Sequence, residues 1–107
     1  MELVESFYLL LKKLPKEERF GLRSQISRSA ISMPSNIAEG YSRSSNKDRA
    51  RFLEISIGSA FELETQLLIG QKVGFFNQSD VDKRLAKLHE FQKKTNALRN
   101  KIKLDIK

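Results

Sequence analysis

Basic residues gather at two places in this 107-residue sequence, and the chemistry open to them is the binding of phosphate groups. The candidate residues are Arg43, Lys47, Arg49 and Arg51 in the first group and Lys87, Lys94, Lys101 and Lys103 in the second. Phosphates that such side chains neutralise release their counterions, which gives affinity with little information about nucleotide sequence. The two groups therefore predict a surface that binds nucleic acid without strong sequence preference.

A plainer explanation stands beside this one. Lys87, Lys94 and Lys101 recur every seven residues, and a line of lysines also keeps a helix soluble or pairs with acids of a neighbouring subunit. The composition favours an anionic partner, because 20 Lys and Arg against 13 Asp and Glu give a net charge of +7. The chain has no Trp, and most Phe residues fall on apolar stripes, so base stacking on aromatic side chains is not indicated.

Catalysis finds little support in the residues present. With no Cys, thiolate nucleophiles, thiolate metal sites and disulfides are excluded. The single histidine, His89, cannot supply the two Glu-x-x-His units of a di-metal bundle, and a boundary residue explains it better than a hydrolase base does. Glu62 and Glu64, considered with Glu54 as Mg²⁺ ligands, point about 200° apart on a helix and cannot share one ion. We expect no enzyme activity, no metal and no cofactor.

Four helical segments must position these side chains. Five Gly and two Pro leave little material for the turns of a sheet, and stripes of mostly apolar residues recur at helical spacing. The stripes are Leu3, Phe7, Leu10 and Leu14 in the first segment; Leu22, Ile26, Ala30, Met33, Ile37 and Tyr41 in the second; and Val81, Leu88, Thr95 and Ile102 in the last. The expected helices are Glu2–Leu14, Pro15–Ser42, Asn46–Val73 and Asp80–Asp105. Pro34 falls inside the apolar stripe of the second helix, which continues beyond it, so we expect a kink there and not a helix end.

The helix ends carry sequence signals of their own. Ser45 followed by Asp48, and Ser79 followed by Asp82, resemble capping boxes that open the third and fourth helices. Gly74 is a suitable C-terminal cap for the third helix. These signals predict short connections between the helices.

Short connections make successive helices antiparallel neighbours, so the predicted fold is all-α: one up-down-up-down four-helix bundle domain over residues 1–107. At ~1.5 Å per residue, the second to fourth helices measure about 40 Å each and the first only about 20 Å. The first helix then cannot cover the others along their full length, and another copy of the chain is the simplest cover. Apolar residues span a wide arc of the third helix, and Gly58 there would let a second helix approach closely.

This topology places the second turn at the same end of the bundle as the C-terminus. The basic residues that meet there form a cluster that we name the basic pole: Arg43, Lys47, Arg49, Arg51, Lys101, Lys103 and Lys107. Charge is segregated along the chain, because residues 19–51 hold seven basic and two acidic groups, residues 52–71 hold three acidic groups and no basic one, and residues 72–107 hold ten basic and four acidic groups.

No segment is suited to a membrane. The longest apolar run, Phe7–Leu11, is too short to span a bilayer. Glu2 and Glu5 stand where a signal peptide would carry positive charge. We expect a cytoplasmic protein with no membrane partner.

Three stretches of the sequence resemble a known family. They are PKEERFG at Pro15–Gly21, SRSAISMPSNIAEG at Ser27–Gly40 and FLEISIGSAFELETQLL at Phe52–Leu68. Together they closely resemble the bacterial four helix bundle protein family, whose members are also called 23S rRNA intervening-sequence proteins. The resemblance covers about Tyr8–Phe76. The C-terminal helix is similar to that of the family in its general character more than in its residue identities. Family members usually have a longer first helix, whereas Met1 here falls inside it.

The resemblance implies a small antiparallel bundle that assembles into a homo-oligomeric ring, a pentamer, and most members have no established activity. Some relatives are encoded in intervening sequences within rRNA genes. A related branch, the accessory variability proteins of diversity-generating retroelements, binds a reverse transcriptase and nucleic acid. The implied partners are therefore the chain itself, RNA or DNA, and a reverse transcriptase or another nucleic-acid enzyme.

Five polar residues of the matching stretches lie among apolar ones: Arg28, Asn36, Glu39, Glu62 and Glu64. Unpaired, each would be costly in a core. We expect structural or subunit-interface pairing rather than a ligand contact. The pairing considered is that of Arg28 with Glu39 through neighbouring helices, or of Arg28 with Glu62 and Glu64.

Two functions remain open. The first is a non-catalytic, ring-forming protein whose basic surface binds RNA, another nucleic acid or a nucleoprotein partner. The second is an oligomeric protein–protein interaction module whose charges serve subunit contacts and solubility. A helix-turn-helix over Ile26–Arg43 ranks below both, because the helix that follows is too long for a recognition helix and Pro34 interrupts the first element.

Overall fold

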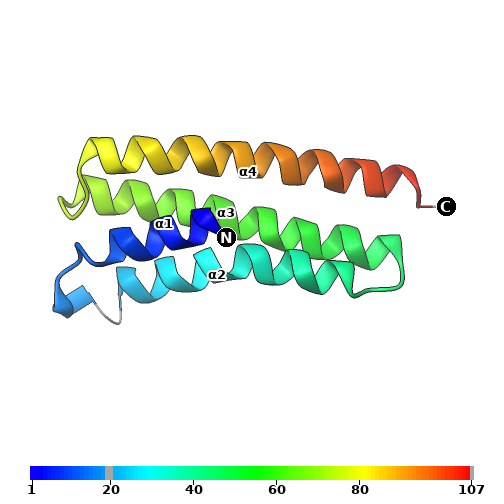
Figure 1. Cartoon of the computed structure of the whole chain (residues 1–107), viewed down its shortest axis with the longest axis horizontal. Coiled ribbons are helices and arrows are strands. Elements are labelled where there is room, and N and C mark those ends of the chain that lie inside the picture. The colour runs from blue at the N-terminus through cyan, green and yellow to red at the C-terminus, as the bar shows by residue number, and fades with distance from the viewer. Residues whose placement is uncertain (19–20, 107) are drawn as a thin grey trace.

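The computed structural model describes residues 1–18 and 21–106. In these residues the chain forms α1 (Glu2–Leu11), a 3-10 turn η1 (Lys16–Glu18), α2 (Leu22–Tyr41), α3 (Asn46–Lys72) and α4 (Gln78–Leu104). The helices run alternately in opposite directions along the 49 Å long axis (Figure 1). α1 packs on α2 and α4, and α3 packs on the same two helices from the opposite corner. The predicted all-α, up-down-up-down bundle with a short first helix is confirmed.

The core is built from one apolar stripe of each helix. Phe7, Ile26, Leu63 and Leu88, one from each helix, are fully buried. The stripes expected on the first and last helices are confirmed, because their members are buried or half-buried: Leu3, Phe7, Leu10 and Leu14, and Val81, Leu88, Thr95 and Ile102. Burial of these side chains at about 25 cal/mol per Å² is the main force that holds the four helices together.

The second helix begins later than the sequence predicts. The segment after Pro15 forms the separate turn η1, and α2 starts at Leu22, where the backbone N–H donates to the Glu18 carboxylate (3.2 Å). With 20 residues, α2 is therefore about 30 Å long and not 40 Å. Pro34 lies inside α2 and does not end it, as expected. Tyr41, expected on the buried stripe, is 61% exposed instead.

The ends of α3 follow the sequence signals, and the start of α4 does not. Ser45 accepts a hydrogen bond from the Asp48 backbone N–H (3.1 Å), and Gly74 adopts a φ of +89° directly after the α3 cap. At α4, however, the cap is Asn77, whose Oδ1 accepts from the Asp80 backbone N–H (2.8 Å). Ser79 lies inside the first turn, where it cannot cap, because the helix starts two residues earlier than expected.

Removal of the observed cap tests this correction. We expect Asn77→Ala to lower the free energy of unfolding by about 1 kcal/mol, because a backbone N–H at the start of α4 loses its acceptor. Ser79→Ala, at the position favoured by the sequence pattern, is the matched control and is expected to change stability by less than about 0.5 kcal/mol. Urea unfolding of both variants measures the difference, and an equal loss in both would show that Asn77 is not the cap.

A polar cluster fastens α1 to the start of α4. Arg84 donates to the Ser6 backbone oxygen (2.9 Å) and forms an ion pair with Asp80 (3.5 Å). Asp80 also forms an ion pair with Lys13, just after α1. The hydrogen bond from Lys13, joined by the charges of Lys13 and Arg84, lowers the pKa of Asp80 against the opposing effect of burial.

The Asp80 contacts predict a pH dependence. Because the folded state lowers the pKa of Asp80, its contribution to stability is present above the ordinary carboxyl pKa of about 4 and is lost as the pH falls through the lower folded value. We expect Asp80→Asn to be less stable than the wild type at pH 7, with the difference shrinking below pH ~4. Asp82→Asn, an exposed acid on the same turn, is the control. A difference for Asp80→Asn that stays constant with pH would show that its charge is not used.

Candidate nucleic-acid interface

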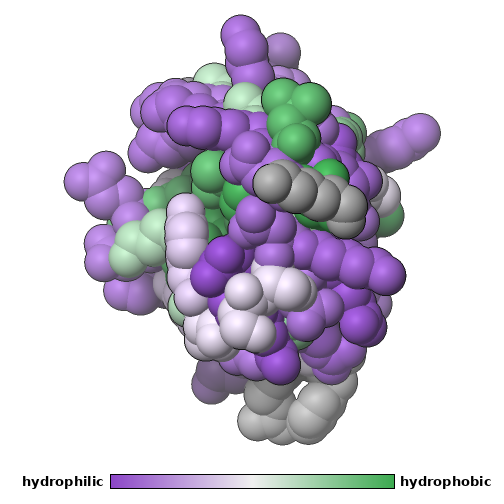
Figure 2. Space-filling model, turned by 90° about the vertical axis from the view of Figure 1, so that its right-hand side faces the viewer, coloured by the Kyte–Doolittle hydropathy of each residue, from purple (hydrophilic) through white to green (hydrophobic). Residues whose placement is uncertain are grey.

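The second turn and the end of α4 lie at the same end of the bundle, as the topology requires (Figure 1). The turn Ser42–Ser45 joins α2 to α3 there, and α4 ends at Leu104. Hydrophilic side chains cover most of this end, with a few hydrophobic ones between them (Figure 2). Six members of the basic pole are described, and the seventh, Lys107, lies outside the described residues.

Three cations of the basic pole surround one hollow. Lys47 and Arg51, on the first two turns of α3, line a hollow of about 480 Å³ together with Lys103 from the last turn of α4. Asp48 and Glu54 also line it. The N-terminus of α3 adds the partial positive charge of a helix dipole at the same place. The hollow is therefore lined by cations from two helices that are more than 50 residues apart in sequence.

Three cations and two carboxylates line the hollow, so the net charge of its side chains is positive. Glu54 pairs with Lys103 at 2.9 Å, but both side chains are about half exposed, so this pair contributes little to stability and opens readily. Lys47 and Arg51 make no ion pair within residues 1–18 and 21–106. These two side chains are the ones most available to a phosphate group.

The two remaining arginines of the turn are engaged by their own neighbours. Arg43 pairs with Glu39 one helical turn earlier, and its guanidinium lies 4.8 Å from the centre of the Phe52 ring. Arg49 is half-buried and donates to the Asn46 side-chain oxygen (2.9 Å). Their charge adds to the field of the basic pole. Both side chains are held by contacts within the α2–α3 turn, so they are less available to a ligand than Lys47 and Arg51.

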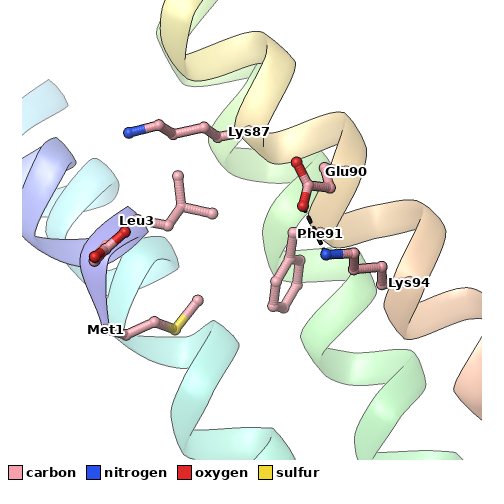
Figure 3. A pocket seen from close by; sticks show the side chains of 7 residues that line it. Met1, Leu3, Lys87, Glu90, Phe91 and Lys94 are labelled. Carbon is pink, nitrogen blue, oxygen red and sulfur yellow. Dashed lines mark hydrogen bonds and ion pairs between the residues drawn. The ribbon is translucent and has the colours of Figure 1, made fainter.

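The lysine line of α4 divides between two regions. Lys101 belongs to the basic pole, whereas Lys87 and Lys94 line a separate hollow of about 320 Å³ beside Met1 (Figure 3). Lys94 forms an ion pair with Glu90 at 2.7 Å, and this interaction lowers the pKa of Glu90. Glu2 also lines this hollow. Two lysines and two carboxylates line it, so its side chains carry no net positive charge, and it is a weaker candidate for phosphate than the hollow at the pole.

Three of the five polar residues of the matching stretches have partners within the chain. Asn36 donates to the Ser32 backbone and side-chain oxygens (both 2.8 Å), and Glu39 pairs with Arg43. Glu64 accepts from the Gln92 side chain (3.0 Å).

Arg28 and Glu62 are both exposed and make no ion pair with each other or with Glu39 and Glu64 in the described part of the chain. Eleven residues along α2 separate Arg28 from Glu39, about 16 Å, which rules out a direct pair within that helix. None of the intrachain ion pairs considered for Arg28 forms in the described residues, and its pairing across a subunit interface stays a prediction.

The helix contacts also use residues that sequence reasoning passed over. Ser56, fully buried on α3, donates to the Met33 backbone oxygen of α2 (2.7 Å), and Ser32 hydrogen-bonds with Ser59 (2.7 Å). On the other side of α3, His89 Nε2 lies 3.2 Å from Glu64. Serines on an apolar face were the one available signal for such interhelical bonds.

The acidic residues and the single histidine of the described residues form no metal-binding cluster. Among residues 1–18 and 21–106, no group of three or more His, Asp or Glu side chains is arranged to hold a metal ion. His89 contacts an acid on the surface of the α3–α4 contact, which is the boundary position expected of it. No described helix is both long and apolar enough to cross a membrane.

Comparison with known proteins identifies a family and a similar solved structure. The family model described as 23S rRNA-intervening sequence protein matches residues 1–97. A solved structure of a protein of unknown function from the S23 ribosomal protein family of Bacteroides thetaiotaomicron is similar to this chain, with a TM-score of 0.84 and 24% sequence identity over 92% of each chain. No curated protein matches.

Proposed function

The chain belongs to the 23S rRNA-intervening sequence protein family, and from this premise we propose that it is a non-catalytic, ring-forming bundle that binds structured RNA through its basic pole. The observation that carries the proposal is the hollow where Lys47, Arg51 and Lys103 meet at the N-terminus of α3. Cations from two helices around one hollow suit a phosphate backbone, whose negative charges recur along a strand.

The basic pole fits the backbone of RNA better than its bases. The hollow holds no aromatic side chain on which a base would stack, since its lining is Lys47, Asp48, Ala50, Arg51, Glu54, Lys103 and Ile106. Phe52, the nearest ring of the turn, is half-buried under Arg43. Affinity is therefore expected to depend on charge and RNA shape, and a nucleoprotein partner would be reached through the same phosphate contacts.

A salt titration tests the proposal. We expect the purified chain to bind a fluorescently labelled structured RNA at micromolar or lower concentration in about 50 mM salt, with affinity that falls steeply towards about 200 mM. Fluorescence anisotropy measures both. Binding that is absent at the lowest salt, or that does not change with salt, would contradict a phosphate-binding role.

The second candidate function is a protein–protein interaction module without nucleic acid. Its support comes from α3, where Ile55, Phe61 and Ile69 are each at least 41% exposed. Exposed apolar residues grouped on one helix are typical of a surface that meets another protein. The salt titration distinguishes the two candidate functions. Binding to phosphate weakens as salt rises, whereas assembly through apolar surface does not.

A further inference from the structure

A second hollow, which we name the groove hollow, lies between α3 and α4 beyond the basic pole. Its volume is about 360 Å³, which is within the range of small-ligand sites. Its walls are two helices that pack side by side and run in opposite directions (Figure 1). The lining residues are Ile57 and Phe61 from α3 and His89, Gln92, Lys93 and Asn96 from α4. An aromatic ring, two amides and a cation therefore meet at a place that the proposed phosphate contacts do not use.

The groove hollow and the hollow at the basic pole lie along the same side of the α3–α4 contact. On α3, Phe61 of the groove hollow follows Glu54 of the other hollow by seven residues. On α4, Asn96 of the groove hollow precedes Lys103 by the same seven residues. Residues seven apart share one side of a helix, and at ~1.5 Å per residue they are about 10 Å apart. An RNA strand whose phosphates contact the basic pole can therefore continue along the groove into the second hollow.

Phe61 gives the groove hollow an exposed aromatic ring. Its side chain is 53% exposed, whereas the other phenylalanines within residues 1–18 and 21–106 are buried or half-buried. A ring in contact with water gains stability when an apolar surface covers it. Every base has a π-face, and proteins hold unpaired bases by stacking them on aromatic side chains. The expectation that no phenylalanine is available for stacking therefore does not hold at Phe61.

Two amide side chains of α4 each keep a polar group for a ligand. Gln92 donates through Nε2 to Glu64 (3.0 Å), and its Oε1 accepts no hydrogen bond from residues 1–18 and 21–106. Asn96 accepts through Oδ1 from Arg99, and its Nδ2 donates to no residue in the described part of the chain. The groove hollow therefore offers one acceptor and one donor. An unpaired base presents the same combination along its edge.

Lys93 gives the groove hollow a positive charge. Its side chain is exposed and makes no ion pair with the described residues. Glu64 contacts two of the lining residues, since it accepts from Gln92 and lies 3.2 Å from His89 Nε2, but it does not line the hollow itself. None of the described lining residues is an acid. A phosphate group beside Lys93 would therefore meet a cation without a competing carboxylate in the lining.

We propose that the groove hollow holds one unpaired nucleotide of the RNA bound at the basic pole. The base stacks on Phe61, its edge hydrogen-bonds with Gln92 and Asn96, and its phosphate pairs with Lys93. This inference rests on the RNA binding proposed above and adds a preference for RNA with an unpaired strand beside its helix. A fully paired RNA keeps its bases stacked inside the helix, so it contacts the basic pole and leaves the groove hollow empty.

Two RNA probes with the same number of phosphates test the preference. One is a hairpin with a short unpaired extension, and the other is a longer blunt hairpin in which all stem nucleotides are paired. We expect the wild type to bind the extended probe about 5- to 150-fold more tightly, which is the range that stacking of one base gives. Charge alone gives the extended probe no advantage, because the phosphate number is equal. Fluorescence anisotropy at about 100 mM salt measures both affinities.

Variants of Phe61 show whether its ring holds the base. Phe61→Leu removes the ring and keeps an apolar side chain, so the preference for the extended probe is expected to fall below about twofold. Phe61→Trp keeps a stacking surface and is expected to retain the preference. Ile69→Ala, at a 49% exposed position of α3 outside both hollows, is the matched control and is expected to bind both probes as the wild type does. Circular dichroism verifies that all three variants fold.

The outcomes separate the groove hollow from the basic pole. If the wild type binds both probes equally and its affinity falls with salt, the groove hollow holds no base and the RNA binding proposed above stands. If Phe61→Leu keeps the full preference, the base is held elsewhere and the assignment of the hollow is wrong. If Phe61→Leu keeps the preference and changes sedimentation, Phe61 belongs to a contact between chains instead. Absence of binding to either probe at about 50 mM salt overturns the RNA binding and the base site together.

Discussion

Gly70→Ala is expected to lower the free energy of unfolding by about 1–3 kcal/mol. A Cβ at this position would overlap two carbons of the Phe76 ring and lie 3.3 Å from a methyl carbon of Leu22. Phe76 is buried in the core, and its backbone N–H donates to the Gly70 oxygen (3.3 Å), so the ring cannot withdraw without opening the α3–α4 turn. Overpacking therefore outweighs the gain of about 0.5–1 kcal/mol in helix propensity.

Gly58→Ala is the control for this effect, because it makes the same chemical change in the same helix. No atom lies within 4 Å of the added Cβ, so alanine is expected to stabilise the dissociated chain by about 0.5–1 kcal/mol. Urea unfolding of both variants in dilute solution measures the difference. If Gly70→Ala is as stable as Gly58→Ala, the packing of Phe76 against α3 is wrong.

The second large effect concerns the basic pole. We expect the triple variant Lys47→Gln, Arg51→Gln and Lys101→Gln to bind structured RNA about 100-fold more weakly than the wild type at about 100 mM salt, because each phosphate contact contributes the release of about 0.7–0.9 counterions. The logarithmic dependence of affinity on salt is expected to become less steep by about 2 for the same reason. Assembly is expected to be unchanged, since all three residues lie at the basic pole and none belongs to the exposed apolar residues of α3.

The matched control removes the same charge from the opposite end of the bundle. Lys16, Lys72 and Lys83 lie in η1, the last turn of α3 and the first turns of α4, which are far from the basic pole (Figure 1). Replacing all three by Gln also takes the net charge from +7 to +4. This control is expected to lose much less affinity. Equal losses in the two triple variants would show that binding follows net charge and not the pole.

The sequence predicted the helices well where apolar periodicity was strong. The stripes of α1 and α4 and the cap at Ser45 appear as expected, because burial of a regular stripe and a local hydrogen bond act over a few residues. The start of α2 was missed, since the acids after Pro15 suit a helix start as well as they suit the separate turn η1. The cap at Asn77 was missed for a related reason: serine and asparagine compete as caps, and only the packed geometry selects one.

The candidate site was predictable in place and less so in detail. Up-down-up-down topology alone brings Lys47 and Lys103 to the same end, and both line the hollow there. The sequence could not show that Arg43 is held by Glu39 and Phe52, or that Lys94 is paired with Glu90, because these contacts depend on side-chain geometry. The exposure of Ile55, Phe61 and Ile69 on α3 was hidden as well, since periodicity marks apolar arcs without saying which part faces solvent.

Lysine footprinting shows whether RNA phosphate binds at the basic pole. The wild-type chain is acylated with and without a saturating structured RNA in about 50 mM salt, and mass spectrometry gives the reactivity of each lysine. We predict protection of Lys47, Lys101 and Lys103 and little change at Lys16, Lys72 and Lys83. Protection spread evenly over both ends, or confined to residues away from the pole, would contradict the account.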